Sequence, residues 1–100
     1  MDVFIKEEEN ATVAKLVGRL DTVVSPEVAN ALAPLQEAAS GTIIIDCSEM
    51  SYISSSGLRI FLGLRKNAAA KGGRVIIRHL PDSIRQVFMM TGFLNLFETQ

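Results

Sequence analysis

The feature that most constrains the fold is a short run of β-branched residues, Thr42–Asp46, which contains three consecutive isoleucines. An uninterrupted apolar run of this length is typical of a strand that is buried on both faces of a sheet. Such strands usually belong to parallel sheets, in which helices connect one strand to the next. The run therefore predicts an α/β domain with this strand near its centre.

One amphipathic helix is expected before this strand in the sequence and another after it, each with apolar residues at three- and four-residue spacing. The first begins at Ser25, because serine can cap free amides and Pro26 suits the first helical positions. Pro34 lies inside the pattern and predicts a bend or a split. The second helix spans about Ser55–Lys71 and ends at Gly72, which can adopt the left-handed conformation.

The remaining periodic segments predict further strands and a third helix. Val3–Glu8 and Thr12–Leu20 are separated by a tight turn and should form an antiparallel hairpin. Arg74–Arg78 is a second β-branched strand, and a third helix begins at Pro81. Leu94–Phe97 is a short apolar segment and a candidate edge strand.

The order of these segments predicts an α/β fold with a mixed β-sheet of about four or five strands. An antiparallel hairpin opens the sheet, parallel strands with right-handed crossovers follow, and three or four helices flank it. The gaps between segments are short, so residues 1–100 are expected to form a single domain.

Composition argues against several classes of function. The 100 residues carry a dispersed formal net charge of −1 without a basic stripe, which disfavours a nucleic-acid partner. The apolar runs are far shorter than the roughly 20 residues of a membrane span, and the start lacks a signal-peptide pattern, so we expect a cytoplasmic protein without membrane insertion. With one cysteine, one histidine and no glycine-rich phosphate loop, no metal and no cofactor are expected.

No set of residues predicts an enzyme. Cys47 has no base beside it and is interpreted as a small buried residue, and His79, next to a turn, is expected to have an exposed or a capping role. A nucleophile, a base and an orienting residue do not line up, so we assign no catalytic residues.

The most informative segment is Asp46–Leu58, in which a predicted loop, Cys47–Ile53, leads to three serines at the start of the long helix. The first amides of a helix lack internal partners, and the helix dipole adds positive charge there. A phosphoryl group, with a charge of about −1.5 to −2, would be favoured at this position. Capping is the commoner role of serine at a helix start, so on these grounds both roles stay open.

Three blocks of the sequence resemble the STAS superfamily, especially its anti-sigma-factor antagonists. Ile53–Leu58, with the sequence Ile-Ser-Ser-Ser-Gly-Leu, lies where the family has a hydrophobic residue followed by Asp-Ser-Ser-Gly-Leu. Gly18–Asp21 resembles the family's Gly-x-Leu-Asp, and Thr91–Phe97 resembles its Thr-Gly-Leu…Leu-Phe ending. The blocks occur in the family's order and cover nearly the whole chain, which implies the STAS fold.

The resemblance also implies a regulatory mechanism. The family's phosphorylated serine maps to Ser55, with Ser54 and Ser56 as alternative acceptors. An anti-sigma factor with serine-kinase activity would phosphorylate it, and a serine phosphatase would reverse the reaction. The unmodified form would bind the anti-sigma factor and free the sigma factor, thereby regulating transcription indirectly, whereas the phosphorylated form would not bind.

The predicted partner-binding surface combines the end of the second strand with the start and open face of the long helix. Its residues are Asp21, Ser54, Ser56, Gly57, Arg59, Gly63 and Lys66. Asp21 is assigned either to this surface or to the turn before Ser25.

One departure from the family pattern keeps a second function open. Ser54 replaces the family's aspartate, which removes a carboxylate that could cap the helix or interact with a kinase. The alternative is a constitutive STAS protein-interaction subunit of a larger signalling or transport assembly, without phosphorylation.

Overall fold

The computed structural model describes residues 1–100, which contain one five-stranded mixed sheet. The strand order is β1-β2-β3-β4-β5; β1 and β2 are antiparallel, and every later pair is parallel. The predicted α/β fold, with its opening hairpin and parallel crossovers, is confirmed. The strands are β1 (Asp2–Glu8), β2 (Ala11–Leu20), β3 (Thr42–Ile53), β4 (Arg74–Arg78) and β5 (Glu98–Thr99).

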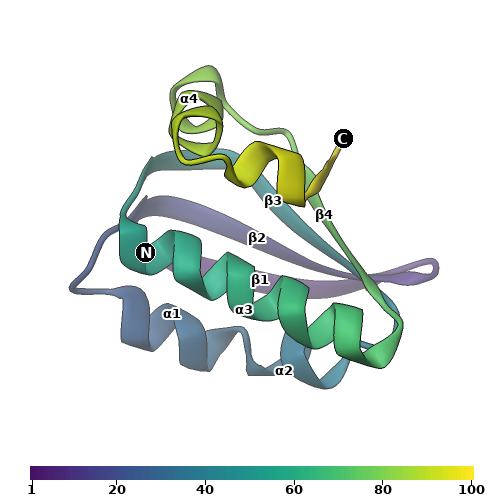
Figure 1. The fold of residues 1–100 in the computed structure, drawn as a ribbon. Coiled ribbons are helices and arrows are strands. Elements are labelled where there is room, and N and C mark those ends of the chain that lie inside the picture. The colour runs from purple at the N-terminus through teal and green to yellow at the C-terminus, as the bar shows by residue number, and fades with distance from the viewer.

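Four α-helices connect the strands, and a short 3₁₀ helix follows them. In Figure 1, α1, α2 and α3 lie side by side, and α4 lies near the far end of β3. The helix broken at Pro34 is split, as predicted, with Leu32 between its two halves. The helices are α1 (Ser25–Ala31), α2 (Ala33–Glu37), α3 (Ser55–Lys71), α4 (Asp82–Met90) and the 3₁₀ helix η1 (Phe93–Leu96).

All four helices pack on the same face of the sheet. The main core joins buried side chains of every helix to alternate residues of the strands, among them Leu16, Ile45 and Ile77. The intervening residues Val13, Ile44 and Ile76 form a small separate cluster that contains no helical residue. The sheet therefore has one covered face and one helix-free face. None of the helices combines the length and the apolar composition that a membrane span requires.

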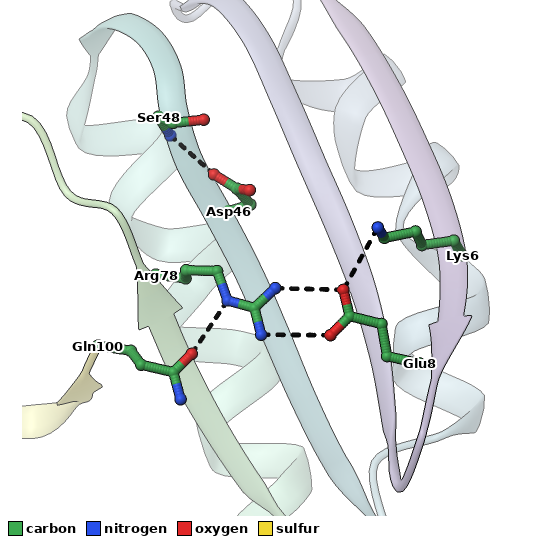
Figure 2. A network of polar contacts seen from close by, with 6 residues as sticks. All are labelled: Lys6, Glu8, Asp46, Ser48, Arg78 and Gln100. Atoms are coloured by element: carbon green, nitrogen blue, oxygen red, sulfur yellow. Dashed lines mark hydrogen bonds and ion pairs between the residues drawn. The ribbon is translucent and has the colours of Figure 1, made fainter.

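Charged side chains from β1 and β4 meet on the helix-free face of the sheet. Arg78 lies over β3 and reaches Glu8, whose carboxylate oxygens are 3.3 Å from two guanidinium nitrogens (Figure 2). Lys6 also contacts Glu8 at 3.3 Å. Val13 and Ile44 are nearly inaccessible to solvent, although their cluster contains no helical residue.

The predicted loop Cys47–Ile53 is wrong, because β3 continues through these residues. The register between β2 and β3 shifts at two points, where β3 carries extra residues. The buried positions consequently fall at Cys47, Met50 and Ile53, three residues apart. A strand interrupted by bulges loses the two-residue period by which a strand is recognised in a sequence.

The candidate edge strand at Leu94–Phe97 is also misplaced. Left-handed Gly92 ends α4, and the chain then forms η1 before the short edge strand β5. Phe97 is buried against Phe88, with ring centroids 6.0 Å apart, so the apolar segment anchors the core rather than the sheet.

Candidate functional site

The candidate site lies where β2 ends and α3 begins. Leu20 is opposite Ile53 in the register of β2 and β3, and the Leu20 carbonyl accepts a hydrogen bond of 2.9 Å from the Ser54 amide. This bond joins the last residue of β2 to the residue that precedes α3. The first and second sequence blocks, which are far apart in the chain, therefore meet at one edge of the sheet.

Ser54 caps α3. It has extended backbone angles, and its hydroxyl oxygen accepts a hydrogen bond of 3.2 Å from the Gly57 amide. The residue is only 8% exposed. Its hydroxyl is thus committed to the helix start, the role that serine most often plays there.

Ser55 and Ser56 are placed differently from Ser54. Ser55 is exposed and Ser56 is half-buried. Their amides cannot form intrahelical bonds, because the residues four positions earlier belong to β3. The first turn of α3 contains no acidic residue, and Arg59 lies one turn after Ser55 on the same side of the helix. The surroundings of Ser55 therefore favour negative charge.

Gly57 fixes how closely α3 approaches the sheet. A Cβ atom at this position would lie 2.7 Å from Leu20 Cγ and 2.9 Å from Ile53 Cγ1. Only a residue without a side chain fits at this distance. Gly57 is buried, so its contribution to the site is to position the helix start.

Asp21 stabilises the turn between β2 and α1. Its carboxylate accepts a hydrogen bond of 3.0 Å from the Val24 amide, and its carbonyl accepts one of 2.7 Å from the Ser25 hydroxyl. Ser25 is therefore inside α1 and does not cap it, contrary to the prediction; Val24 occupies the cap position. Asp21 lies next to Leu20 and hence near the start of α3.

The exposed surface of α3 that carries Ser55, Arg59, Gly63 and Lys66 is called the α3 face below. All four residues are exposed, and a Cβ at Gly63 would meet no atom within 4 Å. The helix contains four cationic residues and no carboxylate, and the four ion pairs of the molecule all lie outside it. The α3 face is therefore positively charged.

Two exposed residues at the same edge were missed in the sequence. Tyr52, which is 40% exposed, stacks under the Arg19 guanidinium at 4.3 Å from the ring centroid. Val23, in the turn after β2, is 84% exposed. Tyr52 could have been found only if Cys47–Ile53 had been recognised as a bulged strand that turns this side chain outward.

Cys47 is unsuited to nucleophilic chemistry. Its side chain is fully buried in the core, and this burial raises the pKa of the thiol to about 12. The thiol therefore stays protonated and inaccessible at neutral pH. This agrees with its interpretation as a small buried residue.

Comparison with protein families gives one match along nearly the whole chain. The family model described as the STAS domain matches residues 3–100. The chain is 26% identical over 98 residues to the anti-sigma-B factor antagonist of Bacillus subtilis (strain 168), with coverage of 98% of this chain and 89% of that protein. It is 28% identical over 99 residues to the anti-sigma-B factor antagonist of Listeria monocytogenes, with coverage of 98% and 87%.

Solved structures show the same architecture. The anti-sigma factor antagonist SpoIIAA in its unphosphorylated form matches with a TM-score of 0.78 and 24% sequence identity, covering 99% of this chain and 88% of that chain. At this identity the similarity concerns the fold alone.

Proposed function

The chain belongs to the STAS domain family, and we propose that it is an anti-sigma-factor antagonist whose binding is switched off by phosphorylation of Ser55. In this proposal the unmodified protein binds an anti-sigma factor with serine-kinase activity, and so frees a sigma factor. A serine phosphatase restores the unmodified form. The relatives in Bacillus and Listeria that are named anti-sigma-B factor antagonists support the proposal that this chain is an anti-sigma-factor antagonist.

The three serines differ in burial and hydrogen bonding, and this difference is the basis for proposing one of them as the phosphate acceptor. A kinase needs an accessible hydroxyl, and among the three only Ser55 is exposed. Phosphorylation of Ser54 would break the hydrogen bond from the Gly57 amide and place a dianion in a buried position. Ser56 is half-buried. Burial and hydrogen bonding thus favour Ser55.

Phosphorylation of Ser55 would change the surface while the domain stays folded. The phosphate would lie at the positive end of the helix dipole and one turn from Arg59, so the domain itself can accommodate it. A partner surface that covers the helix start would have to bury this new charge, at a cost of several kcal/mol unless it is compensated. A few kcal/mol is enough to reduce affinity by a hundredfold or more.

Intact-mass analysis of the protein from its native cells, followed by peptide mapping, tests whether Ser55 carries phosphate. We expect one phosphate on Ser55 in at least one growth or stress condition. Absence of phosphate in every condition, together with stable complex formation, would favour the constitutive interaction subunit. Ser54 in place of the family's aspartate is the observation that keeps this second function in consideration.

A matched pair of variants tests the switch in the binding reaction. Ser55→Asp should weaken binding to the purified anti-sigma factor by about tenfold or more, because a carboxylate carries part of the phosphate's charge. Ser83→Asp is the control, since Ser83 is an exposed serine in the first turn of α4. Titration calorimetry measures both affinities. Equal affinities for the two variants would show that the α3 start is not the regulated surface.

A further inference from the structure

The outer side of β1 is the longest unpaired edge of the sheet. β1 pairs with β2 along seven residues and has no strand on its other side. Two neighbouring large apolar side chains on this strand remain accessible, with Phe4 58% and Ile5 37% exposed. Unpaired backbone groups beside exposed apolar side chains form a surface that readily accepts another strand.

The sequence of β1 is complementary to itself about Phe4. If two copies pair antiparallel with Phe4 opposite Phe4, then Val3 lies opposite Ile5, and Asp2 lies opposite Lys6 at both ends of the pairing. Aromatic pairs and opposite charges directly across two strands each stabilise a sheet. Asp2 takes part in none of the four ion pairs of the molecule. Lys6 contacts Glu8 at 3.3 Å, but its side chain is 69% exposed and so remains accessible to a second carboxylate.

Other registers lack this complementarity. If one β1 strand slides by one residue along the other, Asp2 lies opposite Glu7, and if it slides by one residue more, Asp2 lies opposite Glu8. A shift in the other direction places Asp2 opposite Ile5. A parallel arrangement in register sets Lys6 against Lys6, and like charges directly across a sheet are unfavourable. Only the register centred on Phe4 joins opposite charges and apolar pairs together.

The faces of the sheet agree with this register. Phe4 is opposite Lys15 in the hairpin, and both line a hollow of about 220 Å³ on the helix-free face. Ile5 is opposite the buried core residue Ala14, at the rim of the covered face. The pairing would therefore add apolar contacts on both faces of the sheet. The acidic segment Glu7–Glu9 lies outside the paired residues 2–6.

We propose that β1 binds the β1 strand of a second copy of this chain, so that one sheet continues antiparallel across a symmetric dimer. The symmetry is two-fold, because each residue of one copy contacts the reciprocal residue of the other. Five paired residues per strand make a small interface, so the dimer is transient and depends on concentration. The start of α3 belongs to other elements, so the dimer is independent of the proposed switch.

Cysteine cross-linking tests the register. In the two-fold pairing, Phe4→Cys places two thiols directly opposite each other, within reach of a disulfide. Ile5→Cys is the matched control, because its two copies are offset by two residues and lie too far apart. Oxidised Phe4→Cys protein should contain about tenfold or more covalent dimer than oxidised Ile5→Cys protein. Native Cys47 is fully buried and stays out of the reaction. Equal cross-linking of both variants would refute this register.

A charge swap tests the interface without new thiols. Sedimentation velocity from micromolar to millimolar concentration should show a monomer–dimer equilibrium for the native chain. Asp2→Lys or Lys6→Asp alone should weaken dimerisation by about tenfold, whereas the double variant Asp2→Lys/Lys6→Asp should restore it. Thermal unfolding checks that every variant is folded. A native chain that stays monomeric over this range, or a double variant no better than the single ones, would overturn the proposal.

Discussion

At the scale of single residues, Gly57 controls the position of the whole α3 start. Because a Cβ would lie under 3 Å from both Leu20 and Ile53, Gly57→Ala must push the helix away from the sheet. We expect it to lower the free energy of unfolding by about 1–3 kcal/mol, measured by urea denaturation. Gly63→Ala is the matched control in the same helix. Its side chain would meet open space, so the free energy should rise by up to about 1 kcal/mol. Equal effects would show that Gly57 does not set the packing distance.

Ser54 gives a second prediction at this scale. Ser54→Ala removes the acceptor for the Gly57 amide and should lower the free energy of unfolding by about 0.5–2 kcal/mol. Ser54→Asp supplies a carboxylate acceptor in its place and should differ from the native protein by less than about 0.5 kcal/mol. Urea denaturation measures both, with Ser51→Ala as the control because Ser51 is exposed. A loss for Ser54→Ala no larger than that for Ser51→Ala would contradict the capping role.

The three serines show how far residue-level prediction can reach. The sequence places all of them at the start of a helix, and this was correct. The residues alone did not separate the cap from the proposed phosphate acceptor, because all three have the same side chain, and the choice of Ser55 over Ser54 and Ser56 came from the resemblance to the STAS family. Their burial is set by β2, whose last carbonyl binds the Ser54 amide from a segment 34 positions earlier in the chain. A contact between segments so far apart in the chain cannot be predicted from the residues around Ser54 alone.

At the scale of elements, the Glu8–Arg78 pair links the first hairpin to β4. The hydrogen bonds from Arg78 hold the pKa of the Glu8 carboxyl below its ordinary value of 4.5. A carboxyl whose pKa is lowered on folding stabilises the folded state above the unfolded pKa, and this contribution is lost as the pH falls through the folded pKa. We therefore expect Glu8→Gln to be less stable than the native chain at neutral pH.

The difference between Glu8→Gln and the native chain should shrink as the pH falls below the ordinary value of 4.5, because the native carboxyl becomes protonated as the pH passes through its lowered pKa. Urea denaturation across this pH range measures the difference. Glu9→Gln is the control, because Glu9 is exposed in the hairpin turn and forms no ion pair. A difference that does not change with pH would mean that the pair contributes through packing alone.

Element prediction succeeded where the periodicity was regular. The split at Pro34 and the bounds of α3 follow from local rules for proline, capping and glycine. The prediction of elements failed at residues 47–53. There, two shifts in register between β2 and β3 space the buried side chains three residues apart instead of two. The position of a bulge depends on the partner strand, so this segment could not be assigned from its own sequence.

At the scale of the whole molecule, charge is distributed unevenly although the formal net charge is only −1. All four ion pairs join residues of the strands, and Lys6, Lys15 and Arg78 are neutralised there. The α3 face lacks carboxylates, and its Arg59 and Lys66 have no ion-pair partner. A protein that binds this face should present an acidic surface, which phosphate on Ser55 would repel.

We therefore expect association with the proposed anti-sigma-factor partner to depend on salt through two particular residues. Arg59→Gln and Lys66→Gln should each slow association several-fold at low ionic strength, and the difference from the native protein should diminish as salt is added. Lys6→Gln removes the same charge from the helix-free face and should leave the rate nearly unchanged. Stopped-flow measurement at several salt concentrations gives these rates. If Lys6→Gln slows association as much as Lys66→Gln does, then only net charge matters, and the α3 face is not where the partner binds.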